Sequence, residues 1–145
     1  MIIHIATDHA GYDLKNDIKN YLLKKGYEVI DHGAFQYEAD DDYPDFIFPC
    51  AKAVASDKNS KGIILGGSGQ GEAMAANRLK GIRAAVYYGS EADIPLLSRQ
   101  HNNSNILSIG SRFVSKDQIL FVLDKWITEP FSGGRHQRRI DKLDI

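Results

Sequence analysis

The residues best suited to chemistry lie in one glycine-rich run, Gly66-Gly67-Ser68-Gly69-Gln70-Gly71-Glu72. Four glycines allow backbone N–H groups to turn toward a ligand at positions that side chains would block. The run lacks the Lys-Ser/Thr pair of a nucleoside triphosphate loop, and Glu72 stands where a dinucleotide fingerprint has its last small residue. A glutamate in the first turn of a helix is a candidate base, because the helix dipole and burial shift its pKa in opposite directions. A plain tight turn with a helix-favouring acid is the alternative interpretation.

Two histidines, each beside a polar residue, extend this set. In Asp8-His9 the carboxylate can accept from a sugar hydroxyl and the imidazole can titrate or contact a phosphate. Capping of a helix by Asp8 explains that dipeptide equally well. His101-Asn102 ends a helix-like segment, where a histidine can serve merely as a partner of the helix dipole. Taken alone, neither pair decides between these interpretations.

Three arginines are candidates for binding a phosphate. Arg135 and Arg139 are four residues apart, so on a helix their guanidinium groups share a face and can hold one anion. Arg112 can add a third contact. A basic run near a chain end can also be simply solvated. Together with the carboxylate, the histidines and the glycine run, the arginines suit proton transfer beside the carbonyl of a phosphorylated substrate.

Alternating strands and helices, which the sequence predicts, must position these groups. Short apolar runs predict the strands and amphipathic spacing predicts the helices. We predict strands over 2–7, 28–31, 62–65, 83–88 and 105–109, and helices over 11–25, 44–56, 72–79, 92–101 and 116–128. This order indicates an α/β protein, a three-layer Rossmann-like fold with a five-stranded parallel sheet. Ligands bind beyond the carboxyl ends of such strands, which is where Asp8, the glycine run and Arg112 fall.

Three local features carry expectations of their own. Pro49 should kink or interrupt the second helix, because proline removes a backbone donor. Lys15 falls among the polar residues of the first helix, opposite its apolar face. The loop 36–42 holds four acidic residues, which we interpret as a solvated surface.

The composition narrows the class of protein. A length of 145 residues suits one domain, 1–145, and 43% hydrophobic with 26% charged residues is ordinary for a globular chain. A net charge of −1 gives no overall field for nucleic acid or an anionic membrane. The lone Cys50 excludes an internal disulfide and fits a reducing compartment, so we expect a cytoplasmic location. The start of the chain has no secretory leader pattern, and no run is long enough to span a membrane.

Seven motifs in order along almost the whole chain resemble the ribose-5-phosphate isomerase B and galactose-6-phosphate isomerase family. They are Ala6-Thr7-Asp8-His9-Ala10-Gly11, Asp42-Tyr43-Pro44-Asp45, the glycine run through Ala76-Asn77, Gly81-Ile82-Arg83-Ala84, Ser98-Arg99-Gln100-His101-Asn102-Asn103, Gly110-Ser111-Arg112 and Gly134-Arg135-His136-Gln137-Arg138-Arg139. The resemblance implies a metal-independent aldose-ketose isomerase without a cofactor. It also implies a homodimer, with a tetramer as a further option, whose C-terminal segment reaches the partner's active site.

The resemblance also implies roles for single residues. Glu72 would move a proton between C1 and C2 of ribose 5-phosphate through a cis-enediolate, and His101 would open the furanose ring. Substrate contacts would come from Asp8, His9, Tyr43, Gly67, Ser68, Gly69, Gln70, Gly71, Asn102, Arg112, Arg135 and Arg139. One branch of the family places a cysteine base where this chain has Gly66, so the chain resembles the glutamate branch.

Two alternatives stay open at this stage. A six-carbon substrate, allose or galactose 6-phosphate, would use the same residues, because pocket depth is not written in the sequence. A nucleotide-binding regulatory module would rest on the glycine run together with Glu91, about 20 residues beyond it. That module would have no use for Glu72, His101 or the paired arginines.

Overall fold

A five-stranded parallel sheet forms the centre of the computed structural model, which describes residues 1–145. The strands are β1 (Ile2–Thr7), β2 (Glu28–Asp31), β3 (Lys61–Gly66), β4 (Ala84–Tyr87) and β5 (Ile106–Gly110), in the spatial order β2-β1-β3-β5-β4. Every neighbouring pair is parallel. The predicted strands are confirmed, with ends that differ by one residue at most.

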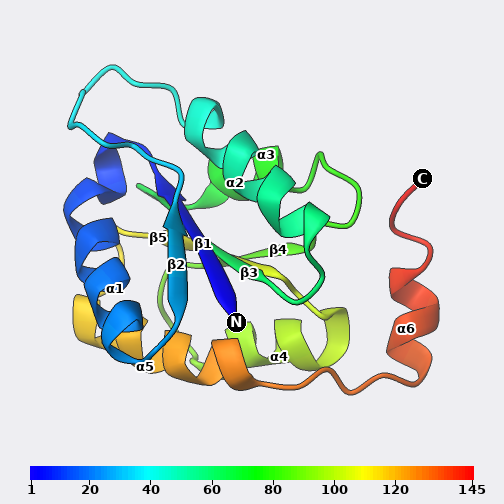
Figure 1. Cartoon of the computed structure of the whole chain (residues 1–145). Helices are drawn as coiled ribbons and strands as arrows, with labels where there is room; N and C mark the ends of the chain where they lie inside the picture. The colour runs from blue at the N-terminus through cyan, green and yellow to red at the C-terminus, as the bar shows by residue number, and fades with distance from the viewer.

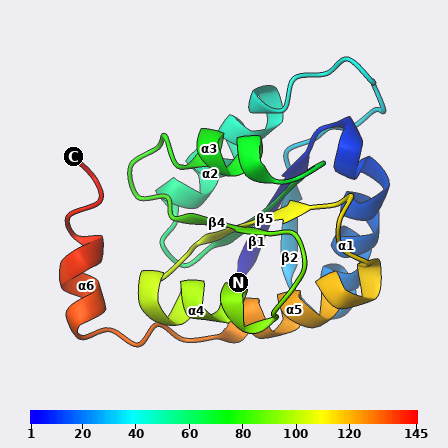
Figure 2. The ribbon, with the colours of Figure 1, turned by 180° about the vertical axis from the view of Figure 1, so that it is seen from behind.

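Helices cover both faces of the sheet (Figures 1 and 2). They are α1 (Tyr12–Lys24), α2 (Pro44–Ser56), α3 (Gln70–Ala76), α4 (Asp93–Asn102), α5 (Lys116–Thr128) and α6 (Arg135–Ile140), and a short 3-10 turn, η1 (His9–Gly11), precedes α1. α2 and α3 lie on one face, while α1, α4 and α5 lie on the other, so the three-layer prediction is confirmed. α6 lies apart from both layers and contacts α4. No helix combines the length and apolar composition that a membrane crossing needs.

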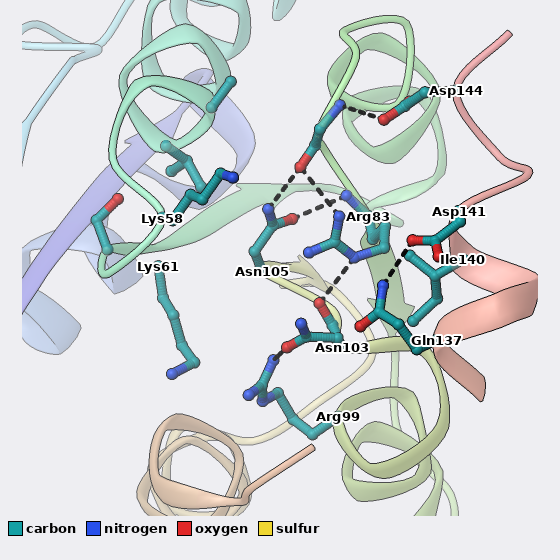
Figure 3. Close-up of a pocket in the computed structure, with 14 residues that line it drawn as sticks. Lys58, Lys61, Arg83, Arg99, Asn103, Asn105, Gln137, Ile140, Asp141 and Asp144 are labelled. Atoms are coloured by element: carbon teal, nitrogen blue, oxygen red, sulfur yellow. Dashed lines mark hydrogen bonds between the residues drawn. The ribbon is translucent and has the colours of Figure 1, made fainter. Parts of the chain in front are cut away.

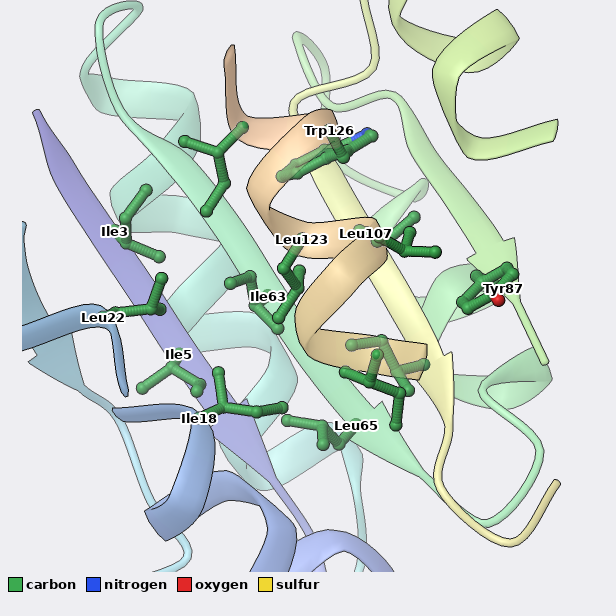
Figure 4. Packing of buried hydrophobic residues seen from close by; sticks show 14 of the residues in the cluster. Ile3, Ile5, Ile18, Leu22, Ile63, Leu65, Tyr87, Leu107, Leu123 and Trp126 are labelled. Atoms are coloured by element: carbon green, nitrogen blue, oxygen red, sulfur yellow. The ribbon is translucent and has the colours of Figure 1, made fainter. Parts of the chain in front are cut away.

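Two apolar clusters hold the layers together, one on each face of the sheet. The larger packs β-strand residues such as Ile5, Ile63 and Leu107 against α1 and α5, with Trp126 fully buried at its end (Figure 4). Isoleucine and leucine suit strands that are buried on both faces. The smaller cluster joins β3 to α2 and α3. The strands that carry the candidate residues therefore rest on a rigid base.

The expected interruption of the second helix does not occur, and the expected position of Lys15 is wrong. α2 runs unbroken through Pro49, whose lost hydrogen bond would have ended on the carbonyl of Asp45 in the solvent-facing first turn. Lys15 is not on a solvated face: its side chain is 1% exposed, its Nζ lies 2.9 Å from Asp31 Oδ1, and it donates to the carbonyl of Ala34 at 2.6 Å. The Lys15 side chain therefore ties α1 to the end of β2 and to the chain that follows it.

Candidate active site

The candidate residues that follow β1 and β3 meet at the carboxyl edge of the sheet. α1 leaves β1 toward one face and α3 leaves β3 toward the other, so a topological switch point lies between these adjacent strands, where open sheets have their crevice. Ligands bind at such points in open parallel sheets. Asp8 and His9 lie on one side of this crevice and the glycine run lies on the other.

The glycine run is anchored to the end of β5. Gly69 has a φ of 78°, a left-handed conformation that glycine adopts without strain. The hydroxyl of Ser108 donates to the carbonyl of Gly69 at 2.7 Å, and that of Ser111 donates to the carbonyl of Gly66 at 2.6 Å. Among the run's N–H groups, those of Gly67, Ser68, Gly69 and Gly71 have no acceptor within the protein. These four groups are available to an anion.

Glu72, in the first turn of α3, folds back over the end of β3. A Cβ at Gly66 would overlap its carboxylate, so the cysteine found there in one branch of the resembling family would occupy the same space. Glu72 is 5% exposed. Burial raises the pKa of its carboxyl, the negative charge of Asp8 raises it further, and the residue's own N–H partly opposes the shift. A carboxyl with a raised pKa is a better proton acceptor near neutral pH.

Arg112 and Tyr43 border the same crevice. The Arg112 guanidinium Nη1 lies 3.1 Å from the position of a Cβ at Gly67, and the Tyr43 ring lies 2.7 Å from that of a Cβ at Gly71. Asp8 is buried and accepts from the N–H of Ala10 at 2.9 Å, so it does cap η1. Burial nevertheless raises the pKa of Asp8. The remaining predicted residues of the run, Ser68 and Gln70, are exposed.

Asp41 is a residue that the sequence interpretation missed. It lies in the acidic loop that we expected to be solvated, yet its side chain is 7% exposed and its Oδ1 is 2.7 Å from His9 Nδ1. The same oxygen accepts from the His9 backbone N–H at 3.2 Å, and Oδ2 is buried without a partner. This contact raises the pKa of His9 and leaves Nε2 free for a ligand. Nothing in a run of four acids marks which one turns inward.

We expect Asp41→Asn to lower the pKa of His9 by about one unit, because a nearby carboxylate favours the imidazolium. The pKa is raised in the folded protein, so the imidazolium should persist to a higher pH in the wild type than in the variant. An NMR titration of the histidine rings measures both midpoints. Asp42→Asn, at the exposed neighbouring position, is the matched control and should leave the His9 midpoint unchanged. Equal midpoints in the wild type and Asp41→Asn would remove this role from Asp41.

Asp8, His9 and Asp41 are also the residues that would hold a cation if the protein bound one. Asp8, His9 and Asp41 each offer one ligand atom, and these atoms lie within 4.8 Å of one another. The expectation of a metal-free protein stays a prediction. Cys50 is far less suited to ligation, because it is fully buried in the smaller apolar cluster and burial raises the pKa of its thiol.

The other predicted residues gather at the opposite edge of the sheet. α4 runs back from the carboxyl end of β4, so His101 and Asn102 at its end lie near the start of β5. There they share a small surface pocket with His136 and Arg139 of α6. The His101 and His136 rings stack with centroids 4.4 Å apart, and burial together with the charges of His101, Arg135 and Arg139 lowers the pKa of His136. One chain therefore presents two separate groups of predicted residues.

Comparison with known proteins identifies close relatives over nearly the full length. The family described as Ribose/Galactose Isomerase matches residues 3–143. Ribose-5-phosphate isomerase B of Mycolicibacterium paratuberculosis is 44% identical over 99% of this chain and 89% of its own. A crystal structure of ribose-5-phosphate isomerase B from Mycoplasma genitalium with bound ribulose 5-phosphate is 42% identical, with a TM-score of 0.93 over 98% of this chain and 93% of that one. The Clostridium thermocellum enzyme is 44% identical, with a TM-score of 0.93 over 99% and 95%.

Proposed function

The chain belongs to the ribose/galactose isomerase family, and from that premise we propose that it interconverts ribose 5-phosphate and ribulose 5-phosphate. It is an isomerase of the ribose-5-phosphate isomerase B type. One observation carries the assignment of its chemistry to particular residues. The buried Glu72 carboxylate, whose pKa is raised, lies at the switch point beside a corner that holds His9 and Arg112.

The reaction moves two hydrogens, one from C2 to C1 and one from O2 to O1. In our proposal His101 assists opening of the furanose ring, and the Glu72 carboxylate then takes the C2 proton of the open aldose. The C2–H electron pair forms the C1=C2 bond, and the C1 carbonyl electrons move onto O1, which gives a cis-enediolate. Glu72 returns the proton to C1, O1 gains a proton, and O2 loses one as the ketone forms. No redox partner is needed.

Charge that develops on the enediolate requires nearby donors. The free N–H groups of Ser68 and Gly69 are held in place by the run's attachment to β5, so they need no reorganisation when the charge appears. A single donor of this kind contributes about 10²–10³ in rate. Asn102 would add an amide donor. We assign the substrate phosphate to Arg112 and to protonated His9 on this side of the crevice.

The division of the predicted residues between two edges of the sheet supports a shared site. His101, Asn102, Arg135 and Arg139 cannot join Glu72 within one chain, because α4 and α6 place them at the opposite edge. We propose that a second copy supplies them, so that each site of a homodimer joins the two groups. Exposed apolar side chains on the helices concerned, Met74 of α3 and Leu97 of α4, favour burial in such an interface.

Arg139→Ala should raise KM by about 10–100-fold, because a charge-assisted hydrogen bond to the phosphate is worth roughly 1.5–3 kcal/mol. Arg138→Ala is the matched control: Arg138 lies next to it on α6, is also exposed and belongs to no proposed contact. Steady-state kinetics with ribose 5-phosphate distinguish the two variants. If KM and kcat of Arg139→Ala both stay at wild-type values, the basic run is merely solvated.

The function is tested by turnover in EDTA with ribose 5-phosphate, allose 6-phosphate and galactose 6-phosphate in parallel. We expect conversion of ribose 5-phosphate, undiminished by the chelator. Preference for a hexose phosphate would move the assignment to a six-carbon substrate and keep the role of Glu72. Absence of turnover with all three sugars would overturn the proposal and return attention to a nucleotide-binding module.

The domain organisation, the cofactor requirement and the partners of the chain are also proposed. We propose that residues 1–145 form one domain, that no cofactor takes part, and that the second copy is the only macromolecular partner. The net charge of −1 argues against a nucleic-acid partner. The lone, buried Cys50 fits a cytoplasmic location.

A further inference from the structure

A polar cavity of about 580 Å³ lies at the opposite edge of the sheet from Glu72. Its walls come from the end of α2, the starts of β3 and β4, the end of α4, and α6 (Figure 3). Cavities of roughly 300–1,000 Å³ accommodate small molecules. Most such sites are lined by apolar groups, but here polar and charged side chains predominate. Its occupant must therefore be polar.

Two arginines that form no ion pair line this cavity. Arg99 is 7% exposed, and its guanidinium donates only to neutral oxygens. These are the carbonyls of Glu129 at 3.0 Å and Ser104 at 2.5 Å, and Asn103 Oδ1 at 2.9 Å. Arg83 donates to the carbonyl of Asn103 at 2.9 Å. No carboxylate lies within ion-pair distance of either arginine. Buried or partly buried guanidinium groups that lack an ion pair are stabilised when an anion binds to them.

Lys61, at the start of β3, adds a third unpaired cation. It is partly buried and has neither a hydrogen-bond partner nor an ion pair. Burial and the nearby charge of Arg99 lower its pKa to about 8. The positive charges of Lys61 and Arg99 repel each other, and this repulsion is unfavourable in the folded chain. An anion placed between them would turn this repulsion into attraction.

The wall opposite the lysines carries carboxylates. Figure 3 shows Lys58 and Lys61 on one side of the cavity and Asp141 and Asp144 on the other. The Asp144 carboxylate accepts from the N–H of Gly81 at 2.9 Å, and Asp141 accepts from the Gln137 amide at 2.7 Å. Carboxylate oxygens accept readily from hydroxyl groups. The cavity thus offers cationic donors at one end and acceptors at the other.

We propose that this cavity is a second binding site, separate from the catalytic crevice, for a small phosphate monoester with a hydroxyl-bearing body. The phosphate lies between Lys61 and Arg99, and the hydroxyl groups face Asp141 and Asp144. Inorganic phosphate shares the anionic half of this chemistry, so the two ligands should differ in affinity and not in where the anion binds.

The proposal has a measurable consequence for Lys61. The charged groups facing it are Lys58 from the end of α2, Arg83 before β4, Arg99 of α4, and the two aspartates of the α6 wall. A bound dianion outweighs the repulsion from the arginines, so ligand should raise the midpoint of Lys61 above its free value of about 8. Binding then takes up a proton, and affinity should fall as the pH rises above that value.

The first experiment follows the lysine side chains of the full-length protein by NMR with ¹³C-labelled lysine. We expect saturating inorganic phosphate or glycerol 3-phosphate to raise the Lys61 midpoint by about one unit or more, relative to sodium chloride at equal ionic strength. Exposed Lys52 on α2 is the internal control and should not move. Because the readout is local, phosphate bound in the catalytic crevice does not affect it. An unmoved Lys61 midpoint with both ligands would overturn the proposal.

The second experiment compares calorimetric titrations of wild type, Lys61→Met and Lys52→Met with glycerol 3-phosphate at pH 7. Methionine keeps most of the apolar stem of lysine, and circular dichroism verifies the fold. We expect two bound ligands per chain in the wild type and Lys52→Met, and an affinity weaker by about tenfold or more at one site in Lys61→Met. Tighter binding of glycerol 3-phosphate than of inorganic phosphate supports the hydroxyl-bearing ligand, while equal binding identifies free phosphate as the occupant. One ligand per chain in all three proteins would contradict the second site.

Discussion

Glu72→Gln should lower kcat for ribose 5-phosphate by about 10²–10⁴-fold, the range that a positioned acid-base group contributes. The amide is nearly isosteric with the carboxylate, so the packing over Gly66 is kept while the proton acceptor is lost. Substrate binding through Arg112 and His9 should persist. The direct measurement is exchange of the C2 hydrogen of ribose 5-phosphate with solvent, followed by NMR with deuterium-labelled substrate.

A matched control separates loss of the base from loss of any carboxylate. Glu91→Gln changes an exposed glutamate near the start of α4 and should leave both exchange and turnover unchanged. Glu91 belongs to no proposed contact of the isomerase, so a defect there would show a general effect of removing a carboxylate. Exchange at the wild-type rate in Glu72→Gln would take the role of base away from Glu72.

The same variant should be more stable than the wild type at neutral pH. Burial raises the pKa of Glu72 in the folded state above its unfolded value, so the folded chain prefers the protonated carboxyl. That stabilisation is fully present below the unfolded pKa and is lost as the pH rises through the folded one. Glutamine carries no charge at any pH, so thermal unfolding should show a higher Tm for the variant at pH 7 and a vanishing difference in acid. Burial of the proposed base should thus lower stability at neutral pH.

The periodic parts of the sequence predicted the fold well. Buried parallel strands carry runs of Ile, Val and Leu, and the amphipathic helices α1 and α5 each bury one face, so local patterns suffice for them. α6 was not predicted as a helix, because its six residues bury none of their side chains and present no apolar face. Lys15 was misplaced because its ion pair with Asp31 depends on where β2 ends, which helical spacing does not encode.

In the candidate site, too, residues fixed by local sequence patterns could be predicted, while contacts between distant residues could not. The residues directly after β1, β3 and β5 could be named from the sequence, because the carboxyl ends of parallel strands share one edge. Asp41 could not be named, because its contact with His9 joins residues 32 positions apart through an irregular loop. The placement of Glu72 and His101 at opposite edges was implicit in the predicted order of elements, because a helix that joins two parallel strands runs back across the sheet. That separation follows only from the direction in which α4 runs.

This separation yields the sharpest test of the shared site. Glu72→Gln and His101→Asn should each be nearly inactive on cyclic ribose 5-phosphate as purified homodimers, because every site of each lacks one group. After the two variants are unfolded together and refolded at equal concentrations, about half of the dimers should be mixed if pairing is random. In a mixed dimer one site combines the intact Glu72 of one chain with the intact His101 of the other, while the second site lacks both.

Refolded mixtures should therefore regain about a quarter of the activity of refolded wild type, because half of the dimers carry one working site of two. Mixing either variant with itself is the control and should recover nothing. The gain requires that the two residues act from different chains, since residues paired within one chain would leave both sites of a mixed dimer defective. Activity that stays at the level of the single variants, in a mixture shown by mass spectrometry to contain mixed dimers, would place both residues in one chain's site. It would then require α4 and α6 to move far from the positions they hold in this structure.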